Sequence, residues 1–173
     1  MERLNVKNYN IGNLKLTKPY TRPTGYNSKI LYDAKDFKIQ SPLCTVKEID
    51  TKGQKPFIKI SFKISNNFNH FQFFSNIKEI CIEHLLKCIT NLSEEEIRKN
   101  FISTIEKNSD SEMIIKIKLN KSTLYFNKEK KEIHGLEIKP DDKVILLLKT
   151  NGLVWDSVSA SQVWICLQCL KFK

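Results

Sequence analysis

The sequence predicts a mainly β fold with a helical insertion (α+β). Short segments that alternate apolar and polar residues lie on both sides of a central stretch with helical periodicity. The length of 173 residues suits one domain with a real core better than two small ones. The apolar fraction of 40% allows that core to form without metals or disulfides.

The first strands are predicted before residue 65. Residues 56–64 (PFIKISFKI) give the clearest pattern, in which four apolar side chains alternate with Lys59, Ser61 and Lys63. This alternation predicts a half-buried strand with a basic outer face. Shorter β-rich segments precede it at residues 10–18, 29–33 and 36–41.

The middle of the chain is predicted to be helical. Apolar residues recur with the helical period over residues 76–89, which predicts an amphipathic helix. Ser93 is a suitable N-cap for a second helix, with Glu96 at the capping-box position and acids in the first turn.

The second half returns to strands. The predicted strands are residues 112–119, 123–126, 132–138, 143–149 and 162–172. A charged loop (NKEKK) joins the second to the third, and Asn151-Gly152 predicts a tight hairpin turn. Seven to nine short strands around one helical insertion fit a closed or partly open, OB-fold-like antiparallel barrel.

Charge favours a polyanionic partner. The net charge is +10, and residues 1–30 hold six cations against one acid. Coulomb attraction and counterion release favour nucleic acid first and an anionic membrane surface second. Residues 1–28 are also rich in turn-forming residues, so we expect a basic N-terminal arm there and the OB-like nucleic-acid-binding domain over residues 29–173.

The side-chain inventory argues against catalysis, and the sequence predicts no cofactor and no metal. The three histidines lack a nucleophile at a known spacing, and the five glycines form no phosphate loop. Cys166 and Cys169 would face opposite sides of a strand. Cys81, His84 and Cys88 share the apolar stripe of the predicted helix, which favours burial over metal binding.

The compartment is predicted from the cysteines and the apolar segments. Five cysteines, an odd number, follow an N-terminus without an apolar segment, and no stretch approaches the ~20 apolar residues of a membrane span. We therefore expect reduced thiols, no membrane partner and a cytoplasmic protein, with the nucleus as the alternative.

Aromatic residues lie among the basic residues in several segments. Single strands are held by cations that follow the phosphates and by rings that stack on bases. Trp155 follows the predicted turn opposite Trp164, and we expect one of these rings, Trp155, to be accessible. The candidate binding residues are Tyr20, Arg22, Tyr26, Lys59, Lys63, Lys116, Lys118, Tyr125, Lys128, Lys130 and Trp155.

Two segments carry a resemblance to a known family. In KILYDAKDFKIQSPLCTV the pattern is made by Ile30, Tyr32, Ile39, Gln40 and Pro42, and near the C-terminus by Trp155, Trp164, Cys166 and Gln168. With these motifs the chain resembles single-stranded DNA-binding proteins of nucleocytoplasmic large DNA viruses and related cytoplasmic replicons. An expected Phe-Gly pair is missing, and Ala160-Ser161 stands in that region.

The resemblance implies an OB-like barrel that binds single strands without sequence preference during DNA replication and protection. The expected partner is single-stranded DNA, with RNA as an alternative and self-association along the strand as a further contact. The competing interpretation is a structural or transcription-complex interaction protein, such as a virion component or a polymerase-associated subunit. An enzyme is the third and weakest class.

Overall fold

The computed structural model describes residues 1–109 and 111–172. The strands are β1 (Glu2–Leu4), β2 (Leu14–Leu16), β3 (Tyr20–Arg22), β4 (Gly25–Ser28), β5 (Ile30–Tyr32), β6 (Phe37–Gln40), β7 (Cys44–Asp50), β8 (Phe57–Lys63), β9 (Phe101–Ile102), β10 (Ile105–Lys107), β11 (Glu112–Lys118), β12 (Leu124–Phe126), β13 (Lys143–Trp155) and β14 (Ala160–Lys171). The helices are α1 (Phe68–Cys88) and α2 (Glu94–Asn100), with short 3-10 turns at Ile11–Asn13 and Gly135–Glu137.

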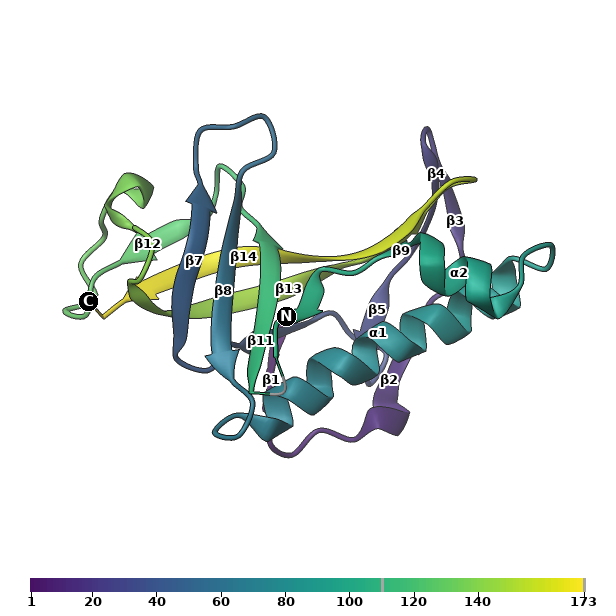
Figure 1. The fold of residues 1–173 in the computed structure, drawn as a ribbon, viewed down its shortest axis with the longest axis horizontal. Helices are drawn as coiled ribbons and strands as arrows, with labels where there is room; N and C mark the ends of the chain where they lie inside the picture. Colours follow the sequence, from purple (N-terminus) through teal and green to yellow (C-terminus); the bar gives the residue numbers. More distant parts are fainter. Residues whose placement is uncertain (110, 173) are drawn as a thin grey trace.

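Strands β7, β8, β11, β14 and β13 close a barrel (Figure 1). β7 pairs with β8 and β8 with β11, β11 pairs with β14, and β13 pairs with both β14 and β7. Only the β11–β14 contact of the ring is parallel. Around the barrel the strands follow the order β7, β8, β11, β14 and β13, which are the first, second, third, fifth and fourth barrel strands along the chain. This is an OB-like topology, so the predicted fold class is confirmed.

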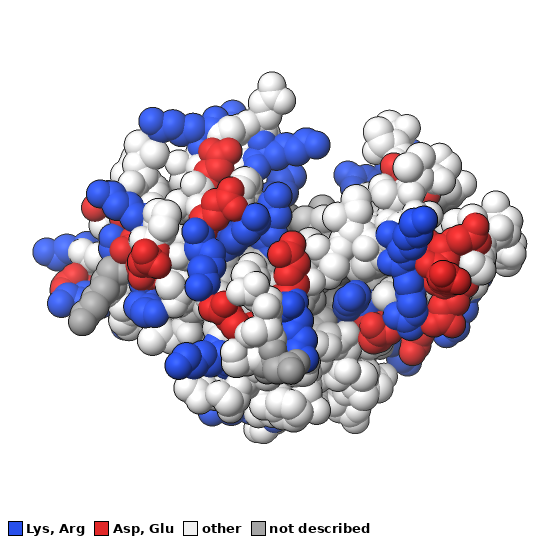
Figure 2. Space-filling model, viewed as in Figure 1, with Lys and Arg blue, Asp and Glu red and all other residues white. Residues whose placement is uncertain are grey.

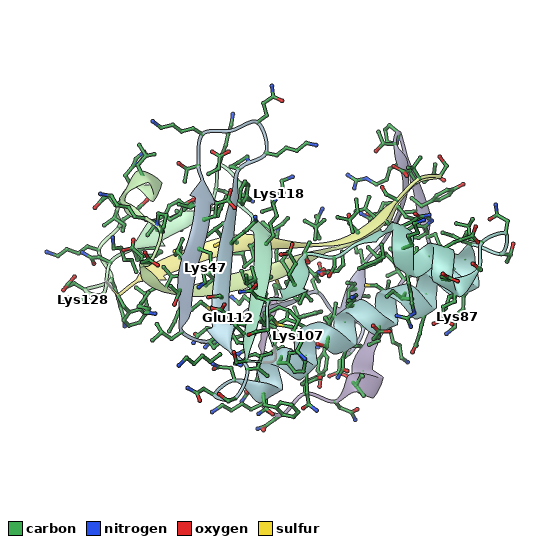
Figure 3. The ribbon with its side chains drawn as sticks, viewed as in Figure 1. Lys47, Lys87, Lys107, Glu112, Lys118 and Lys128 are labelled. Atoms are coloured by element: carbon green, nitrogen blue, oxygen red, sulfur yellow. The ribbon has the colours of Figure 1, made fainter. Side chains whose placement is uncertain are left out.

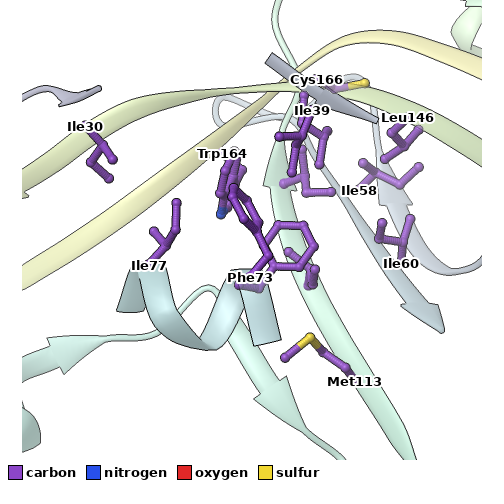
Figure 4. Packing of buried hydrophobic residues seen from close by; sticks show 14 of the residues in the cluster. Ile30, Ile39, Ile58, Ile60, Phe73, Ile77, Met113, Leu146, Trp164 and Cys166 are labelled. Atoms are coloured by element: carbon purple, nitrogen blue, oxygen red, sulfur yellow. The ribbon is translucent and has the colours of Figure 1, made fainter. Parts of the chain in front are cut away.

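The barrel is filled by the alternate side chains of its strands, with α1 packed over one end. Ile58 and Ile60 of β8 are fully buried, as the period-2 pattern predicts. Phe73 and Phe74 of α1 pack against Trp164 of β14, with ring centroids 6.2 and 5.3 Å apart (Figure 4). α1 therefore begins a full two turns earlier than predicted, because these phenylalanines contribute to its buried face.

Strands β13 and β14 extend well beyond the barrel as a long hairpin. Their outer halves pair with β4 on one side and with β9 on the other. α1 runs beneath this extension (Figure 1), and Leu153 and Trp155 of β13 are buried. The extension and the loop between β7 and β8 both project from the barrel (Figure 1).

Residues 1–28, for which the sequence predicts a basic arm, carry β1 to β4. β1 pairs with β6, and β4 pairs with β13. Tyr9 packs edge-on against Phe73, with ring centroids 5.0 Å apart. This segment is thus packed against the barrel and α1, and the division at residue 28 stays a prediction.

Several local predictions are confirmed. Ser93 caps α2 with a complete capping box, since its side chain accepts from the Glu96 amide while the Glu96 carboxylate accepts from the Ser93 amide. The strands predicted at residues 56–64, 112–119 and 123–126 correspond to β8, β11 and β12. The loop NKEKK joins β12 to an antiparallel bridge between Phe126 and Glu132.

Other local predictions are wrong. Residues 132–138 form one bridge and a 3-10 turn in place of a strand. β7, which completes the barrel, was not predicted. Asn151-Gly152 lies inside β13, where the pairing with β14 shifts register. Gly152 has a φ of +88°, and an added Cβ would collide with the carbonyl oxygen of Ser28, so the glycine allows close approach of β4.

Candidate nucleic-acid interface

The outer face of β8 and β11 carries four of the predicted lysines. Lys59 and Lys63 lie on β8, and Lys116 and Lys118 on β11. Their neighbours in sequence point into the barrel, so period-2 alternation turns all four outward. The prediction of a basic outer face is therefore confirmed for these residues, although Ser61 between Lys59 and Lys63 is buried.

Acidic side chains neutralise part of this face. Lys59 is directly opposite Lys116, which is an unfavourable pairing of like charges. A salt bridge of 2.8 Å from Lys59 to Glu48 offsets the repulsion. The hydrogen bond from Lys59 to Glu48, followed by Coulomb attraction, raises the pKa of Lys59. Lys63, Lys116 and Lys118 have no ion pair within the described residues, so two of the three free positive charges on this face lie on β11.

Phe57 supplies an aromatic ring on the same face. It is half-buried at the start of β8, and the Lys116 ammonium lies 4.3 Å from its ring centroid. Lys59 lies 5.9 Å from the same centroid. Sequence reasoning missed this residue, although period-2 alternation from Lys59 places Phe57 on the basic face. Of these two ammonium groups only that of Lys116 is unneutralised, and a ring beside a free ammonium group is the arrangement that holds a base and its phosphate.

Two projections flank this face. One is the loop over residues 51–56 between β7 and β8, which carries Lys52 and Lys55. The other is the tip of the β13–β14 hairpin together with β3 and β4. Figure 2 shows the surface hollowed between them, and Figure 3 shows Lys118 beside this hollow. In OB folds, the face of the second and third strands and its flanking loops bind oligonucleotides.

Trp155 is not accessible, and the prediction that it forms the stacking surface needs correction. It is 5% exposed, and Trp164 is fully buried. The tight turn expected at Asn151-Gly152 does not form, so Trp155 lies within β13 and faces α1. The physical reason is the shift of register at Gly152, which keeps Leu153 and Trp155 on the buried side.

Tyr26 covers Trp155. The two rings are stacked with centroids 5.7 Å apart, and Tyr26 is 47% exposed. The His84 ring packs edge-on against Trp155, with ring centroids 6.1 Å apart. A pocket of about 460 Å³ opens beside these rings, and residues 88–92 at the end of α1 line its far side.

The remaining predicted residues are not brought together. Tyr20 and Arg22 are exposed on β3 at the far end of the extension. Lys128 and Lys130 lie in the loop after β12, and Lys128 lies at the opposite end of the molecule from Lys87 (Figure 3). Tyr125 packs against Gly135, and burial raises the pKa of its hydroxyl to about 12. Its side chain is half-buried, which leaves little of the ring free for a base.

The cysteines are free thiols. Cys166 and Cys169 are both fully buried, which corrects the expectation that they face opposite sides. The pairing of β14 with β13 shifts between Leu147 and Leu148, so the intervening bulge brings both thiols inward. In the described part of the chain, no three His, Cys, Asp or Glu side chains gather as metal ligands would. Of the three residues predicted to be buried on the helix, Cys81 is in the core and His84 is half-buried, whereas Cys88 is exposed because it lies at the last residue of α1, so the prediction is wrong for Cys88.

Within residues 1–109 and 111–172, no helix is long and apolar enough to cross a membrane.

Comparison of the sequence with known protein families and with curated proteins gives no match. Solved structures are similar in fold. They include gp2.5, a single-stranded DNA binding protein encoded by bacteriophage T7, with a TM-score of 0.56, 15% identity and coverage of 79% of this chain and 86% of that one.

The single-stranded DNA-binding protein from bacteriophage Enc34 is similar in its C-terminally truncated form, with a TM-score of 0.60, 12% identity and coverage of 92% of this chain and 94% of that one. The same protein in complex with ssDNA has a TM-score of 0.52, 13% identity and coverage of 90% and 94%. The chain therefore has the OB-like barrel fold that is found in these phage proteins.

Proposed function

We propose that this protein binds single-stranded DNA without sequence preference, and that it protects single strands during DNA replication. The observation that carries the proposal is the contact between Lys116 and Phe57, which places a cation and a half-exposed ring on the oligonucleotide-binding face of an OB-like barrel. Cations on that face would follow the phosphates, and Phe57 would stack on a base. No bond chemistry is required, so we propose a non-enzymatic role.

The similar solved structures support the proposal. The phage proteins with this fold are described as single-stranded DNA-binding proteins, and one of them was solved with ssDNA. The motifs around Tyr32, Gln40 and Pro42 further support a relationship to the single-stranded DNA-binding proteins of large DNA viruses. We place the protein at a cytoplasmic site of viral or plasmid replication.

The decisive test compares three nucleic acids. Binding of a fluorescent oligothymidylate, the matching duplex DNA and oligouridylate should be measured by fluorescence anisotropy at a low and a moderate salt concentration. The single strand should bind more tightly than the duplex, because only unpaired bases can stack on Phe57. Equal affinity for duplex and single strand would instead indicate a general polyanion-binding or structural protein.

A further inference from the structure

A row of cations continues from the β8–β11 face around the barrel. Lys118 of β11 is in register with Ile165 of β14, and Ile165 is in register with Lys149 of β13. Lys149 is in register with Lys38 of β6, and Lys38 with Arg3 of β1. Residues in register on neighbouring strands point to the same side of a sheet, so this row places four cations on the outer side of the barrel, with the buried Ile165 between Lys118 and Lys149.

The row is long enough to guide a strand of nucleic acid. Neighbouring strands lie about 4.8 Å apart, so the four steps from Lys118 to Arg3 span roughly 19 Å of curved surface. At about 3.4 Å per stacked nucleotide, this corresponds to roughly six nucleotides. At Lys118 the row joins the proposed binding face directly, because Lys118 is in register with Phe57 of β8.

The lysines of the row are available for a partner. Within the described residues, no ion pair joins Lys118, Lys149 or Lys38 to an acid. Lys47 and Lys59, on the neighbouring strands β7 and β8, are by contrast held in salt bridges. The row therefore keeps its positive charge, whereas Lys47 and Lys59 are neutralised by their acidic partners.

A groove lies at the far end of the row. It has a volume of about 430 Å³, and Arg3, Lys38 and Lys130 line it together with the Phe126 ring. Leu147 is among the apolar residues that complete the lining. The groove thus repeats the combination found at Phe57, in which cations lie around a partly exposed ring.

We propose that a single strand bound across β8 and β11 continues along this row, over β14 and β13, into the groove beside Phe126. The inference rests on the proposed function and extends it, because it assigns a second segment of the same ligand to a separate surface. Two observations favour nucleic acid over an acidic peptide here. The register connects the row to the β8–β11 face, and the groove offers a ring on which a base stacks.

The test compares two lengths of oligothymidylate, one of about 6 nucleotides and one of about 16, the range that a single OB fold covers. The double variant Lys38→Ala/Lys149→Ala removes the middle of the row. It should bind the short oligonucleotide as the wild type does. It should bind the long one roughly tenfold more weakly at low salt, with a log–log salt slope smaller by about 1.4, since each phosphate contact contributes about 0.7.

A matched control separates this path from a general loss of charge. The variant Lys87→Ala/Lys99→Ala removes two exposed lysines from the helices, and it should bind both oligonucleotides normally. Circular dichroism should show that all variants are folded. The extended path is wrong if Lys38→Ala/Lys149→Ala has wild-type affinity for both oligonucleotides, or if its affinity for both falls by the same factor. The proposed function stands in either case.

Failure of the proposed function has a different outcome, because the wild type would then bind neither oligonucleotide. Poly-glutamate is the remaining probe. If the wild type binds poly-glutamate, the row variant loses that binding, and both oligonucleotides bind the variant normally, then the row is a docking surface for an acidic protein and the inference is overturned.

Discussion

The ring of Tyr26 stacks on the ring of Trp155, with centroids 5.7 Å apart and planes inclined by 24°. Tyr26 is nearly half exposed, whereas Trp155 is almost fully buried between Tyr26, His84 and the end of α1. The tyrosine is therefore the surface ring of this hairpin, and the tryptophan supports it from below. This division of roles leads to different expectations for the two residues.

Trp155→Ala should mainly destabilise the fold. Truncation of a buried aromatic ring costs about 3–5 kcal/mol, whereas loss of the stacked partner in Tyr26→Ala should cost only about 1 kcal/mol. Urea unfolding followed by circular dichroism measures both. Tyr26→Ala should also shift Trp155 emission to longer wavelength, because the indole becomes exposed. A stable Trp155→Ala variant with weakened DNA binding would identify Trp155 as a direct base contact instead.

Phe57→Ala should weaken single-strand binding without unfolding the protein. The ring is half-buried at the edge of the barrel, and a lost base stack costs about 1–3 kcal/mol of binding free energy. Anisotropy titration with oligothymidylate measures the change. Phe68→Ala is the matched control, since Phe68 is an exposed ring at the start of α1 and should leave affinity unchanged. Equal affinity of the Phe57 variant and the wild type would remove Phe57 from the binding face.

Binding should weaken steeply with salt, because cations on β11 release counterions from the phosphates. In Lys116→Ala/Lys118→Ala the slope of log affinity against log salt should decrease in magnitude by about 1.4. Titrations at several salt concentrations give the slope. The variant Lys87→Ala/Lys99→Ala loses the same charge elsewhere and should keep the wild-type slope. An unchanged slope in the β11 variant would place the phosphates on another surface.

Stability should fall as pH drops below about 6.5. Burial lowers the pKa of both His70 and His84 below their ordinary value of 6.5, despite a hydrogen bond from His70 to the Gln40 carbonyl oxygen. Between the folded pKa and 6.5 the unfolded chain binds more protons, so the stability present above 6.5 is lost progressively with acid.

Thermal unfolding of the wild type and of His70→Gln/His84→Gln at a series of pH values tests this. The variant should show a flatter dependence in that window. Glu96 and Glu112, whose hydrogen bonds lower their pKa, lose their contribution only below their ordinary value of 4.5, so the two effects separate on the pH axis. The same steepness in variant and wild type near pH 6 would assign the effect to other groups.

Gly152→Ala should destabilise the pairing of β4 with β13 in the hairpin extension. A side chain at φ +88° is strained by about 1–3 kcal/mol, and its Cβ would also collide with the Ser28 carbonyl oxygen of β4. Hydrogen exchange of the β4 and β13 amides should become faster, while the barrel amides keep their protection. Asn151→Ala, one residue earlier and exposed, is the control. Wild-type stability of Gly152→Ala would mean that β4 can move aside without cost.

The sequence alone determined the features that depend on neighbouring residues. Strand β8 follows from the alternation of Ile58, Ile60 and Phe62 with outward residues, and α2 follows from Ser93 and Glu96. The basic face of β8 and β11 follows for the same reason, since period-2 alternation depends only on backbone geometry. The mainly β class with a helical insertion could therefore be predicted.

Only the tertiary structure decided which faces meet. Trp155 lies in the core because a register shift at Gly152 keeps β13 running where a hairpin turn was expected. The same kind of shift turns both Cys166 and Cys169 inward. The cation row from Lys118 to Arg3 joins residues more than a hundred positions apart, through pairings that are set by barrel closure. Local periodicity fixes which face of a strand is buried, but it does not show which strand is its partner or where a bulge interrupts the pairing, because these depend on packing between distant segments.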